Sequence, residues 1–203
     1  MSLVVENLSH EYSQGKRVLD DFSLKIADRE IVAVVGHSGC GKTTLLHCIV
    51  GLLTPIKGSV IVDGIDVIKK KTHERGIGIM MQDQPLYEHI SVEQNIAFPL
   101  RSRMGKKPDV SHILEQLELL PIAKQKVSMC SGGERRRVAF GRAIVTQPAV
   151  LLLDEPFVSL NEELRITMSR LISDTGITTL LVTHDTSEAE AIASRIIALK
   201  NHP

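Results

Sequence analysis

The segment 31–43 places the strongest constraint on how this chain can fold. Five apolar residues, Ile31–Val35, lead directly into Gly36-His37-Ser38-Gly39-Cys40-Gly41-Lys42-Thr43, which has P-loop spacing: Gly, four residues, then Gly-Lys-Ser/Thr. The apolar run is typical of a strand buried on both faces of a parallel sheet. Lys42–Leu53 then reads as a helix. This order of strand, glycine-rich turn and helix predicts an α/β fold.

Composition narrows the class of protein. The chain has 203 residues, is 43% apolar and has a formal net charge of zero. The length and apolar content suit a single domain. The zero net charge argues against an overall positive potential of the kind that attracts nucleic acid. Its three cysteines lack zinc spacing and are too few for a disulfide scaffold. The N-terminus has no signal-peptide pattern and no apolar run is long enough for a membrane span, so we expect a soluble, cytoplasmic protein.

The expected elements change character along the chain. The N-terminal third is predicted to be β-rich, with turns at Gly15, Asp20-Asp21 and Gly58 and strands at Leu3–Leu8, Phe22–Ile26, Glu30–Val35 and Ser59–Val62. A further strand is expected at Gly76–Gln82, and a capping box at Ser91 opens a mostly helical stretch. From Gly132 onward helix and strand alternate, with strands at 149–154, 178–183 and 195–199 and helices at 162–173 and 187–193.

These patterns predict one domain over residues 1–203. Its fold class is α/β: a P-loop NTPase core with a mainly parallel sheet, an N-terminal antiparallel β subdomain and an inserted helical lobe. Residues 1–82 and 131–203 are expected to form the core with the β subdomain, and residues 83–130 the helical lobe.

The glycine-rich turn predicts a phosphate site. Its glycines let successive backbone N–H groups point inward at phosphate oxygens, and the following helix adds the positive end of its dipole. Lys42 supplies a charge for the β- and γ-phosphates, and Thr43 offers a hydroxyl to Mg²⁺. The expected nucleotide-binding residues here are Gly36, His37, Ser38, Gly39, Cys40, Gly41, Lys42, Thr43 and Thr44.

Three later positions add candidate catalytic groups at predicted strand ends, where open α/β sheets bind ligands. Asp154 and Glu155 follow an apolar strand; Asp154 is expected to orient Mg²⁺ and Glu155 to polarise the attacking water. Gln82 can ligate Mg²⁺ and hydrogen-bond the same water. His184 can hydrogen-bond the γ-phosphate beside Glu155. Each alone also fits an ordinary surface or structural residue.

Ser131-Gly132-Gly133-Glu134 makes the interpretation specific. It opens a helix and therefore predicts a second anion site, which one chain cannot easily wrap around the phosphate held by its own P-loop. With the P-loop upstream and Asp154-Glu155 downstream, the chain resembles the ATP-binding cassette (ABC) family. The resemblance implies that the element of one subunit faces the P-loop of another, so that a homodimer or paired cassette holds ATP at its interface.

The resemblance extends over nearly the whole chain. Tyr12 stands where this family has an aromatic residue that stacks on adenine, and Val18 stands at the position that flanks the nucleoside. The stretch from Gln82 to Ala97 looks like that of maltose-, iron- and polyamine-type importer subunits. It implies an Mg²⁺-dependent ATPase that is peripheral on the inner face of the cell membrane. Its implied partners are integral-membrane permease subunits and an extracytoplasmic solute-binding protein, with no nucleic acid.

Alternatives within the same fold remain open at this point. They are an exporter-type or lipoprotein-extracting ATPase, a soluble cassette that acts on DNA or ribosomes, and a cassette that binds ATP without hydrolysing it. Cys40, Cys130 and Asn161 depart from the family pattern, which has Asp at the last of these positions. The two thiols are expected to be reactive near the nucleotide or, alternatively, buried packing residues. We interpret the arginines at 135, 136, 137 and 142 mainly as a solvated helix face.

Overall fold

The structure is a computed structural model that describes residues 1–203 apart from 14–15, 84, 101–107, 159 and 200–203. An antiparallel sheet runs in the order β2-β1-β4-β5 and consists of β1 (Leu3–Ser13), β2 (Lys16–Ile26), β4 (Lys57–Val62) and β5 (Ile65–Asp66). A parallel sheet runs in the order β6-β7-β8-β3-β9 and consists of β3 (Ile31–Val35), β6 (Ile77–Met80), β7 (Val150–Asp154), β8 (Thr178–Thr183) and β9 (Arg195–Ala198). The α/β fold class with an N-terminal antiparallel part is therefore confirmed.

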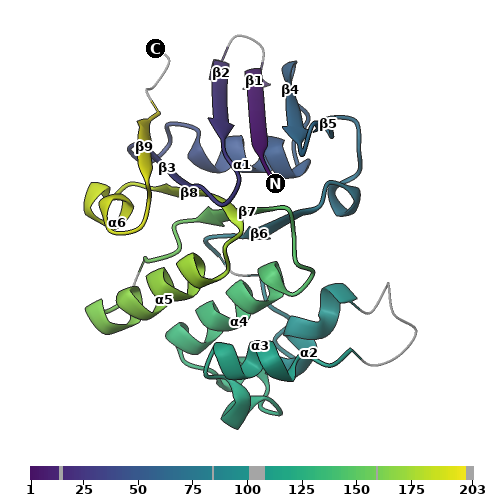
Figure 1. The fold of residues 1–203 in the computed structure, drawn as a ribbon, viewed down its shortest axis with the longest axis vertical. Helices are drawn as coiled ribbons and strands as arrows, with labels where there is room; N and C mark the ends of the chain where they lie inside the picture. The colour runs from purple at the N-terminus through teal and green to yellow at the C-terminus, as the bar shows by residue number, and fades with distance from the viewer. Residues whose placement is uncertain (14–15, 84, 101–107, 159, 200–203) are drawn as a thin grey trace.

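The helices cover both faces of the parallel sheet. The α-helices are α1 (Lys42–Val50), α2 (Val92–Ala97), α3 (Ser111–Gln116), α4 (Gly132–Ile144), α5 (Glu162–Asp174) and α6 (Thr186–Glu190). Short 3₁₀ helices occur at Thr72–Glu74, Phe98–Leu100, Leu120–Ile122 and Val127–Met129. In Figure 1, α1 lies between the two sheets, while α4 and α5 lie on the other side of the parallel sheet.

Alternating side chains of the parallel strands build two cores. On β7, Val150 and Leu152 belong to the core shared with α1 and the antiparallel sheet, whereas Leu151 and Leu153 belong to the core shared with α4 and α5. Successive strand residues point to opposite faces, so a strand covered on both sides must be apolar throughout. This explains why the predicted strands at 31–35 and 149–154 carry no polar alternation.

The first two strands of the antiparallel sheet are longer than predicted. They were expected at 3–8 and 22–26, but each has 11 residues. The turn predicted at Asp20-Asp21 is wrong, because β2 continues through it with register shifts in the pairing to β1. Asp21 has a φ of 54°, and its N–H donates to Ser9 Oγ at 2.9 Å. That side-chain acceptor replaces a ladder bond and lets the strand continue as a bulge. Gly15 lies outside the described residues.

The segment 83–130 packs on α4. Gly141 of α4 is packed so closely that a Cβ there would lie 2.6 Å from Leu117 Cδ1 and 3.1 Å from Ile96 Cδ1. Asn95 of α2 is fully buried, and its amide donates to the carbonyl oxygens of Tyr87 and Ser91. The capping box expected at Ser91 is present. The division of the chain into a core and an inserted lobe stays a prediction.

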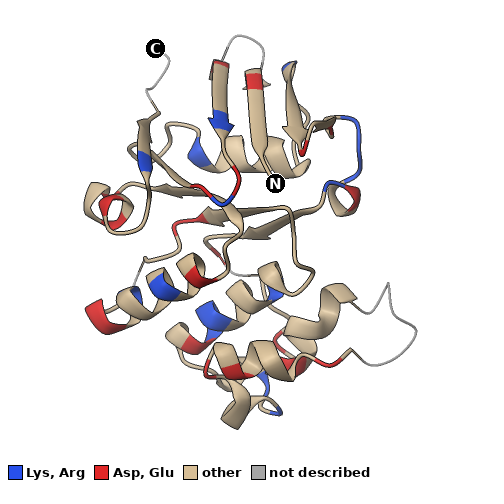
Figure 2. Ribbon diagram, in the orientation of Figure 1, with Lys and Arg blue, Asp and Glu red and all other residues tan. Residues whose placement is uncertain are grey.

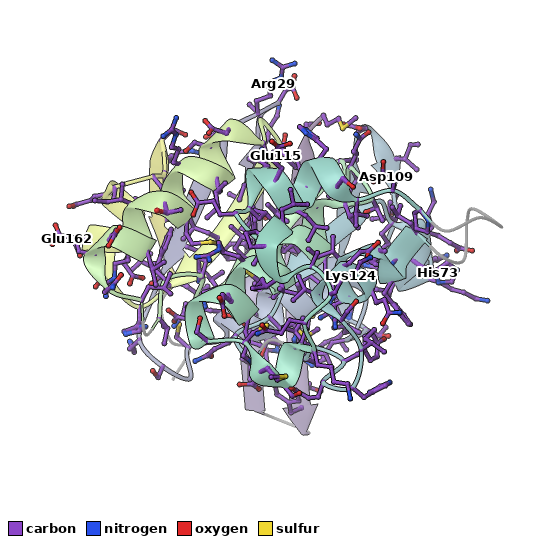
Figure 3. All side chains as sticks on the ribbon, turned by 90° about the horizontal axis from the view of Figure 1, so that it is seen from below. Arg29, His73, Asp109, Glu115, Lys124 and Glu162 are labelled. Atoms are coloured by element: carbon purple, nitrogen blue, oxygen red, sulfur yellow. The ribbon has the colours of Figure 1, made fainter. Side chains whose placement is uncertain are left out.

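Two inner strands of the parallel sheet, β3 and β8, contain no charged residue. Lys, Arg, Asp and Glu of both signs are spread over helices and loops (Figure 2). Arg29, His73 and Glu162 project from the periphery in Figure 3. Within the described residues, no helix combines the length and apolar character needed to cross a membrane.

The end of α1 depends on Arg75. The helix was expected to reach Leu53 but ends at Val50, where Gly51 adopts a φ of 87°. Arg75 is 5% exposed, and its guanidinium donates to the carbonyl oxygens of Cys48 and Ile49 at the end of this helix. It also donates to the carbonyls of Ile68 and Lys70. One buried side chain thus satisfies carbonyls that the helix itself leaves free.

We expect Arg75→Met to lower the free energy of unfolding by roughly 2–4 kcal/mol, because several buried carbonyl oxygens lose their donor. Urea unfolding followed by circular dichroism measures this change. Arg170→Met is the matched control, since Arg170 is exposed on α5 and pairs with Asp174 in the same helix. Equal unfolding midpoints for the two variants would contradict the role of Arg75.

Candidate functional site

The carboxyl ends of β3, β8 and β7 meet at one edge of the parallel sheet. β3 pairs with β8 so that Val35 is opposite Thr183, and β7 pairs with β8 so that Asp154 is opposite Val182. Gly36 follows β3, and its N–H donates to the Thr183 carbonyl at 3.3 Å. The glycine-rich turn, the two carboxylates and His184 therefore come together through strand pairing alone.

Lys42 lies inside the glycine-rich turn. It is 7% exposed, and its Nζ donates to the carbonyl oxygens of Gly36 at 2.6 Å and His37 at 3.1 Å. The same Nζ lies 3.8 Å from Glu155 Oε1. Gly39 and Gly41 have φ values of 83° and 101°, a conformation that side-chain-bearing residues rarely adopt. The turn holds a buried ammonium group close to a carboxylate.

Thr43 and Asp154 form the second part of the site. Thr43 Oγ1 donates to Asp154 Oδ2 at 2.9 Å. Asp154 is 3% exposed, and its Oδ1 is buried without a hydrogen-bond partner among the described residues. Burial raises the pKa of Asp154 above its ordinary value, and the hydroxyl of Thr43 opposes that rise. A hydroxyl beside a carboxylate oxygen with unused acceptor capacity fits the oxygen ligands that Mg²⁺ prefers, directly or through water.

Glu155 is the most constrained residue of the site. Its φ of 49° lies in the left-handed region, which costs a non-glycine residue on the order of 1–3 kcal/mol and is frequent at functional sites. The side chain is 6% exposed, and both carboxylate oxygens lie 3.0 Å from His184 Nδ1. The imidazole of His184 is half exposed. The pair places a buried carboxylate behind an imidazole that reaches solvent.

Tyr12 lies near the glycine-rich turn, on β1. It is 62% exposed, its hydroxyl lies 3.0 Å from Thr44 Oγ1, and the buried ring of His10 meets it edge-on with 5.0 Å between centroids. Val18 of β2 packs on the same turn, since a Cβ on Gly41 would lie 2.9 Å from Val18 Cγ1. The structure therefore brings both predicted nucleoside contacts to the P-loop helix.

Two predicted elements are not brought into contact with the rest. Gln82 is exposed two residues beyond β6, and no hydrogen bond joins it to another described residue. Ser131 and Glu134 bond to each other in a capping box, with Ser131 Oγ accepting from the Glu134 N–H and Glu134 Oε2 accepting from the Ser131 N–H. Among the described residues, no hydrogen bond links 131–134 to the glycine-rich turn. Ser131 and Gly132 are exposed.

The interpretation of the arginines as a solvated face is wrong for three of them. Arg135 forms an ion pair with Glu88, and Arg142 lies 5.8 Å over the ring of Tyr87. Arg136 is 7% exposed and donates to the carbonyl oxygens of Pro156 and Val158. The sequence pattern does not reveal the burial of Arg136, because its acceptors are backbone carbonyls of a loop distant in the chain.

The cysteines favour the packing alternative. Cys40 is 3% exposed, and its Sγ fills the space beside Gly36, where a Cβ would lie 2.5 Å from it. Cys130 is half-buried, and burial raises the pKa of its thiol. A thiol whose pKa is raised is less reactive at neutral pH.

Sequence reasoning did not single out two residues next to Glu155. Thr183 is fully buried, and its Oγ1 lies 3.2 Å from Glu155 Oε2 and 2.8 Å from Glu188 Oε2. Glu188 of α6 is itself 7% exposed. Thr183 could have been found from its position at a predicted strand end beside His184. Glu188 could not, because it lies on a five-residue helix, which is too short to give a periodic pattern.

Comparison with known proteins decides the family. The sequence pattern described as ABC transporter matches residues 19–158. The chain belongs to the ABC transporter family. The sulfate/thiosulfate import ATP-binding protein CysA of Pseudomonas aeruginosa is 38% identical over 98% of this chain and 64% of its own length. The trehalose import ATP-binding protein SugC of Mycobacterium tuberculosis is 38% identical over 97% of this chain and 52% of its own length. The chain thus spans less than two thirds of these ABC relatives.

A solved structure agrees in fold. It is described as the dimeric post-hydrolysis state of the ATP-binding cassette MJ0796 bound to ADP and Pi, and it covers 98% of this chain and 94% of its own. The TM-score is 0.84 at 28% identity. The structure of this ABC chain therefore has the cassette fold.

Asn161, one of the three residues noted above as departures from the ABC pattern, has a structural role. It is the N-cap of α5, and its Oδ1 accepts from the Leu164 N–H at 2.9 Å. Asn and Asp are about equally good at this position because either side-chain oxygen can accept the bond. Asparagine at this position therefore preserves the start of α5, the helix that follows β7.

We expect Asn161→Ala to lower the free energy of unfolding by about 1 kcal/mol through loss of this cap. Asn161→Asp should change it by less than about 0.5 kcal/mol, since the carboxylate accepts the same bond and favours the positive helix end. Urea titration of the three proteins gives both values. An alanine variant as stable as wild type would show that the cap does not stabilise α5.

Proposed function

We propose that this chain is the ATP-hydrolysing, nucleotide-binding subunit of an ABC transporter, and that it works as an importer subunit. The observation that supports this most directly is the cluster at the sheet edge: Lys42 Nζ 3.8 Å from Glu155 Oε1, Thr43 Oγ1 2.9 Å from Asp154 Oδ2, and His184 Nδ1 3.0 Å from Glu155. A cation, a metal-ligating pair and a buried carboxylate with an imidazole are the groups that phosphoryl transfer to water requires.

The glycine-rich turn binds the phosphates in this proposal. Its N–H groups and the start of α1 attract anions, and Lys42 is held by two carbonyl oxygens so that its charge faces the turn. Gly36, His37, Ser38, Gly39, Cys40, Gly41 and Thr44 complete this part of the site through backbone or side-chain donors. The ring of Tyr12, largely exposed beside Thr44, offers a face on which adenine can stack, with Val18 beside the turn.

Thr43 and Asp154 hold Mg²⁺ in this proposal, with Gln82 as a further ligand from the end of β6. Mg²⁺ held by these residues would supply positive charge that offsets the negative charge developing on the phosphates. The raised pKa of Asp154 follows from its burial. A divalent cation beside a carboxylate favours the ionised form. The buried, unused Oδ1 of Asp154 supports this assignment.

Glu155 and His184 position the attacking water. A buried carboxylate accepts a hydrogen bond from water and polarises it toward the γ-phosphate. His184 Nδ1 contacts Glu155 and, if it carries the proton, donates to it; the ring then presents its other nitrogen toward solvent. The left-handed backbone at Glu155 turns the side chain away from the path of β7. We assign Glu155 as the base and His184 as its partner.

A second copy completes the site. Ser131, Gly132, Gly133 and Glu134 open α4, and Ser131 and Gly132 are exposed with no hydrogen bond to the turn of their own chain among the described residues. A C2 dimer in which each α4 faces the partner's glycine-rich turn uses both anion sites on one nucleotide. The dimeric description of the structural relative supports this arrangement.

The names of the relatives support import. Both CysA and SugC are described as import ATP-binding proteins. We therefore propose that the chain acts on the cytoplasmic face of a membrane, on integral-membrane permease subunits that work with an extracytoplasmic solute-binding protein. Closing and opening of the cassette dimer then drive alternating access in the permease.

Glu155→Gln tests the proposed base. The amide keeps the shape of the carboxylate but loses its basicity, so turnover should fall by roughly 10²–10⁴-fold while ATP binding is retained. Phosphate release and nucleotide titration of the purified chain measure the two quantities. ATP should also trap the variant as a dimer on size-exclusion chromatography. Glu115→Gln, an exposed change on α3, is the control. Near wild-type turnover in Glu155→Gln would exclude Glu155 as the base.

Tyr12 variants test the stacking contact. Tyr12→Ala should weaken ATP binding by roughly 1–3 kcal/mol, and GTP should bind with similar affinity because stacking uses the face of the base. Tyr12→Phe should bind nearly as well as wild type, since it keeps the ring and loses only the bond to Thr44. Fluorescent-nucleotide titration compares the three proteins. Unchanged affinity in Tyr12→Ala would leave Tyr12 as a structural residue only.

A further inference from the structure

Glu188 is a buried carboxylate that the proposed chemistry does not use. It lies on α6, one turn after His184, and is 7% exposed. Its Oε2 accepts from Thr183 Oγ1 at 2.8 Å, and its Oε1 lies 3.7 Å from an Arg165 nitrogen. Burying a charge costs free energy unless the charge is paired. The contacts of Glu188 therefore indicate what this buried carboxylate does.

The hydroxyl of Thr183 lies within hydrogen-bond distance of two carboxylates, those of Glu188 and Glu155. It accepts the Asp185 N–H at 3.1 Å and has one proton to donate. Glu188 Oε2 lies at 2.8 Å and Glu155 Oε2 at 3.2 Å. The shorter contact assigns the proton to Glu188. Glu155 then keeps the acceptor capacity of Oε2 for a water molecule.

Glu188 also pairs with an arginine that holds the loop after Glu155. Glu188 Oε1 lies 3.7 Å from a terminal nitrogen of Arg165, and Arg165 Nε donates to the Leu160 carbonyl. Arg136 of α4 donates to the carbonyls of Pro156 and Val158 in the same loop. Burial lowers the pKa of Arg136, and the negative charge of Glu188 opposes that change. The carboxylate therefore pairs directly with the cation on α5.

We infer that Glu188 is a positioning residue for Glu155: it accepts the Thr183 proton in a hydrogen bond and, through Arg165, holds the loop that begins at Pro156. The inference rests on the proposed function of Glu155, but the contacts themselves do not. Glu188 touches no phosphate or water in this role. It acts on the direction of one hydrogen bond and on the position of one loop.

Glu188→Gln changes both features without changing the volume of the side chain. The amide oxygen faces Arg165, which can only donate, so the amide NH₂ faces Thr183 Oγ1. Thr183 must then turn its proton to Glu155 Oε2 and occupy the acceptor needed by water. The loss of charge also loosens Arg165 from Leu160.

The first measurement is the ATPase activity of the purified chain. Glu188→Gln should lower kcat about tenfold, the effect of one redirected hydrogen bond to a charged group, while KM for ATP stays within about twofold. Glu190→Gln is the matched control, because Glu190 is exposed on the same helix and should keep wild-type kcat. In a Thr183→Val background, Glu188→Gln should lower kcat no further. An unchanged kcat, or two effects that multiply in the double variant, would overturn the route through Thr183.

The second measurement does not depend on hydrolysis. Hydrogen–deuterium exchange of the nucleotide-free proteins should show faster exchange over residues 156–165 in Glu188→Gln than in wild type or Glu190→Gln. Thermal melting identifies any global loss of fold, and Glu188→Asp, which keeps the charge near Arg165, should restore most of the protection. Unchanged exchange in Glu188→Gln would overturn the link to the loop. A wild-type chain that hydrolyses no ATP would instead refute the proposed function, and the exchange result would still decide the structural link.

Discussion

Parallel pairing of β3, β8 and β7 brings the residues of the candidate site together. Their carboxyl ends lie side by side because the strands share one direction and adjacent positions in the sheet. Residues more than a hundred positions apart, such as Thr43 and Asp154, therefore meet within 2.9 Å. Any change that shifted this pairing by one residue would turn the side chains to opposite faces and separate the site.

Buried charge is the second feature that shapes this chain. Lys42, Asp154, Glu155, Arg136 and Glu188 are each 7% exposed or less. Each of these charges lies near an opposite charge, a hydroxyl or a carbonyl oxygen, which offsets the cost of removing it from water. The network runs from the glycine-rich turn through Glu155, Thr183 and Glu188 to Arg165 of α5. These contacts connect the glycine-rich turn physically to α5 and to the loop after Glu155, which Arg136 of α4 also holds through two carbonyls.

Much of the core was predictable from local pattern, and the errors have physical causes. Several elements begin and end within one residue of the positions predicted for them. They are the strands at 31–35, 150–154 and 178–183 and the helix at 162–174, and the helix at 132–144 begins where it was predicted to begin. Two of the misses occur where a side chain replaced a backbone bond, and others are the helix expected at 187–193, which ends at Glu190, and the strand expected at 76–82, which spans Ile77–Met80. Ser9 lets β2 run through Asp21, and Arg75 receives the carbonyls of an α1 that ends early. The hairpin of β4 and β5 was missed because β5 has only two residues.

The chemistry of the glycine-rich turn and the order of strands and helices could be inferred from local sequence, because both follow from short-range geometry: glycine at positive φ, and apolar spacing that matches a strand or a helix. Which groups distant in the chain are in contact depends on the packing of the folded molecule. That packing separated Gln82 and the Ser131 element from the turn, buried Arg136 on the carbonyls of Pro156 and Val158, and placed Thr183 between Glu155 and Glu188. Such contacts depend on how sheets and helices pack, and no local pattern records the partner of a buried polar group.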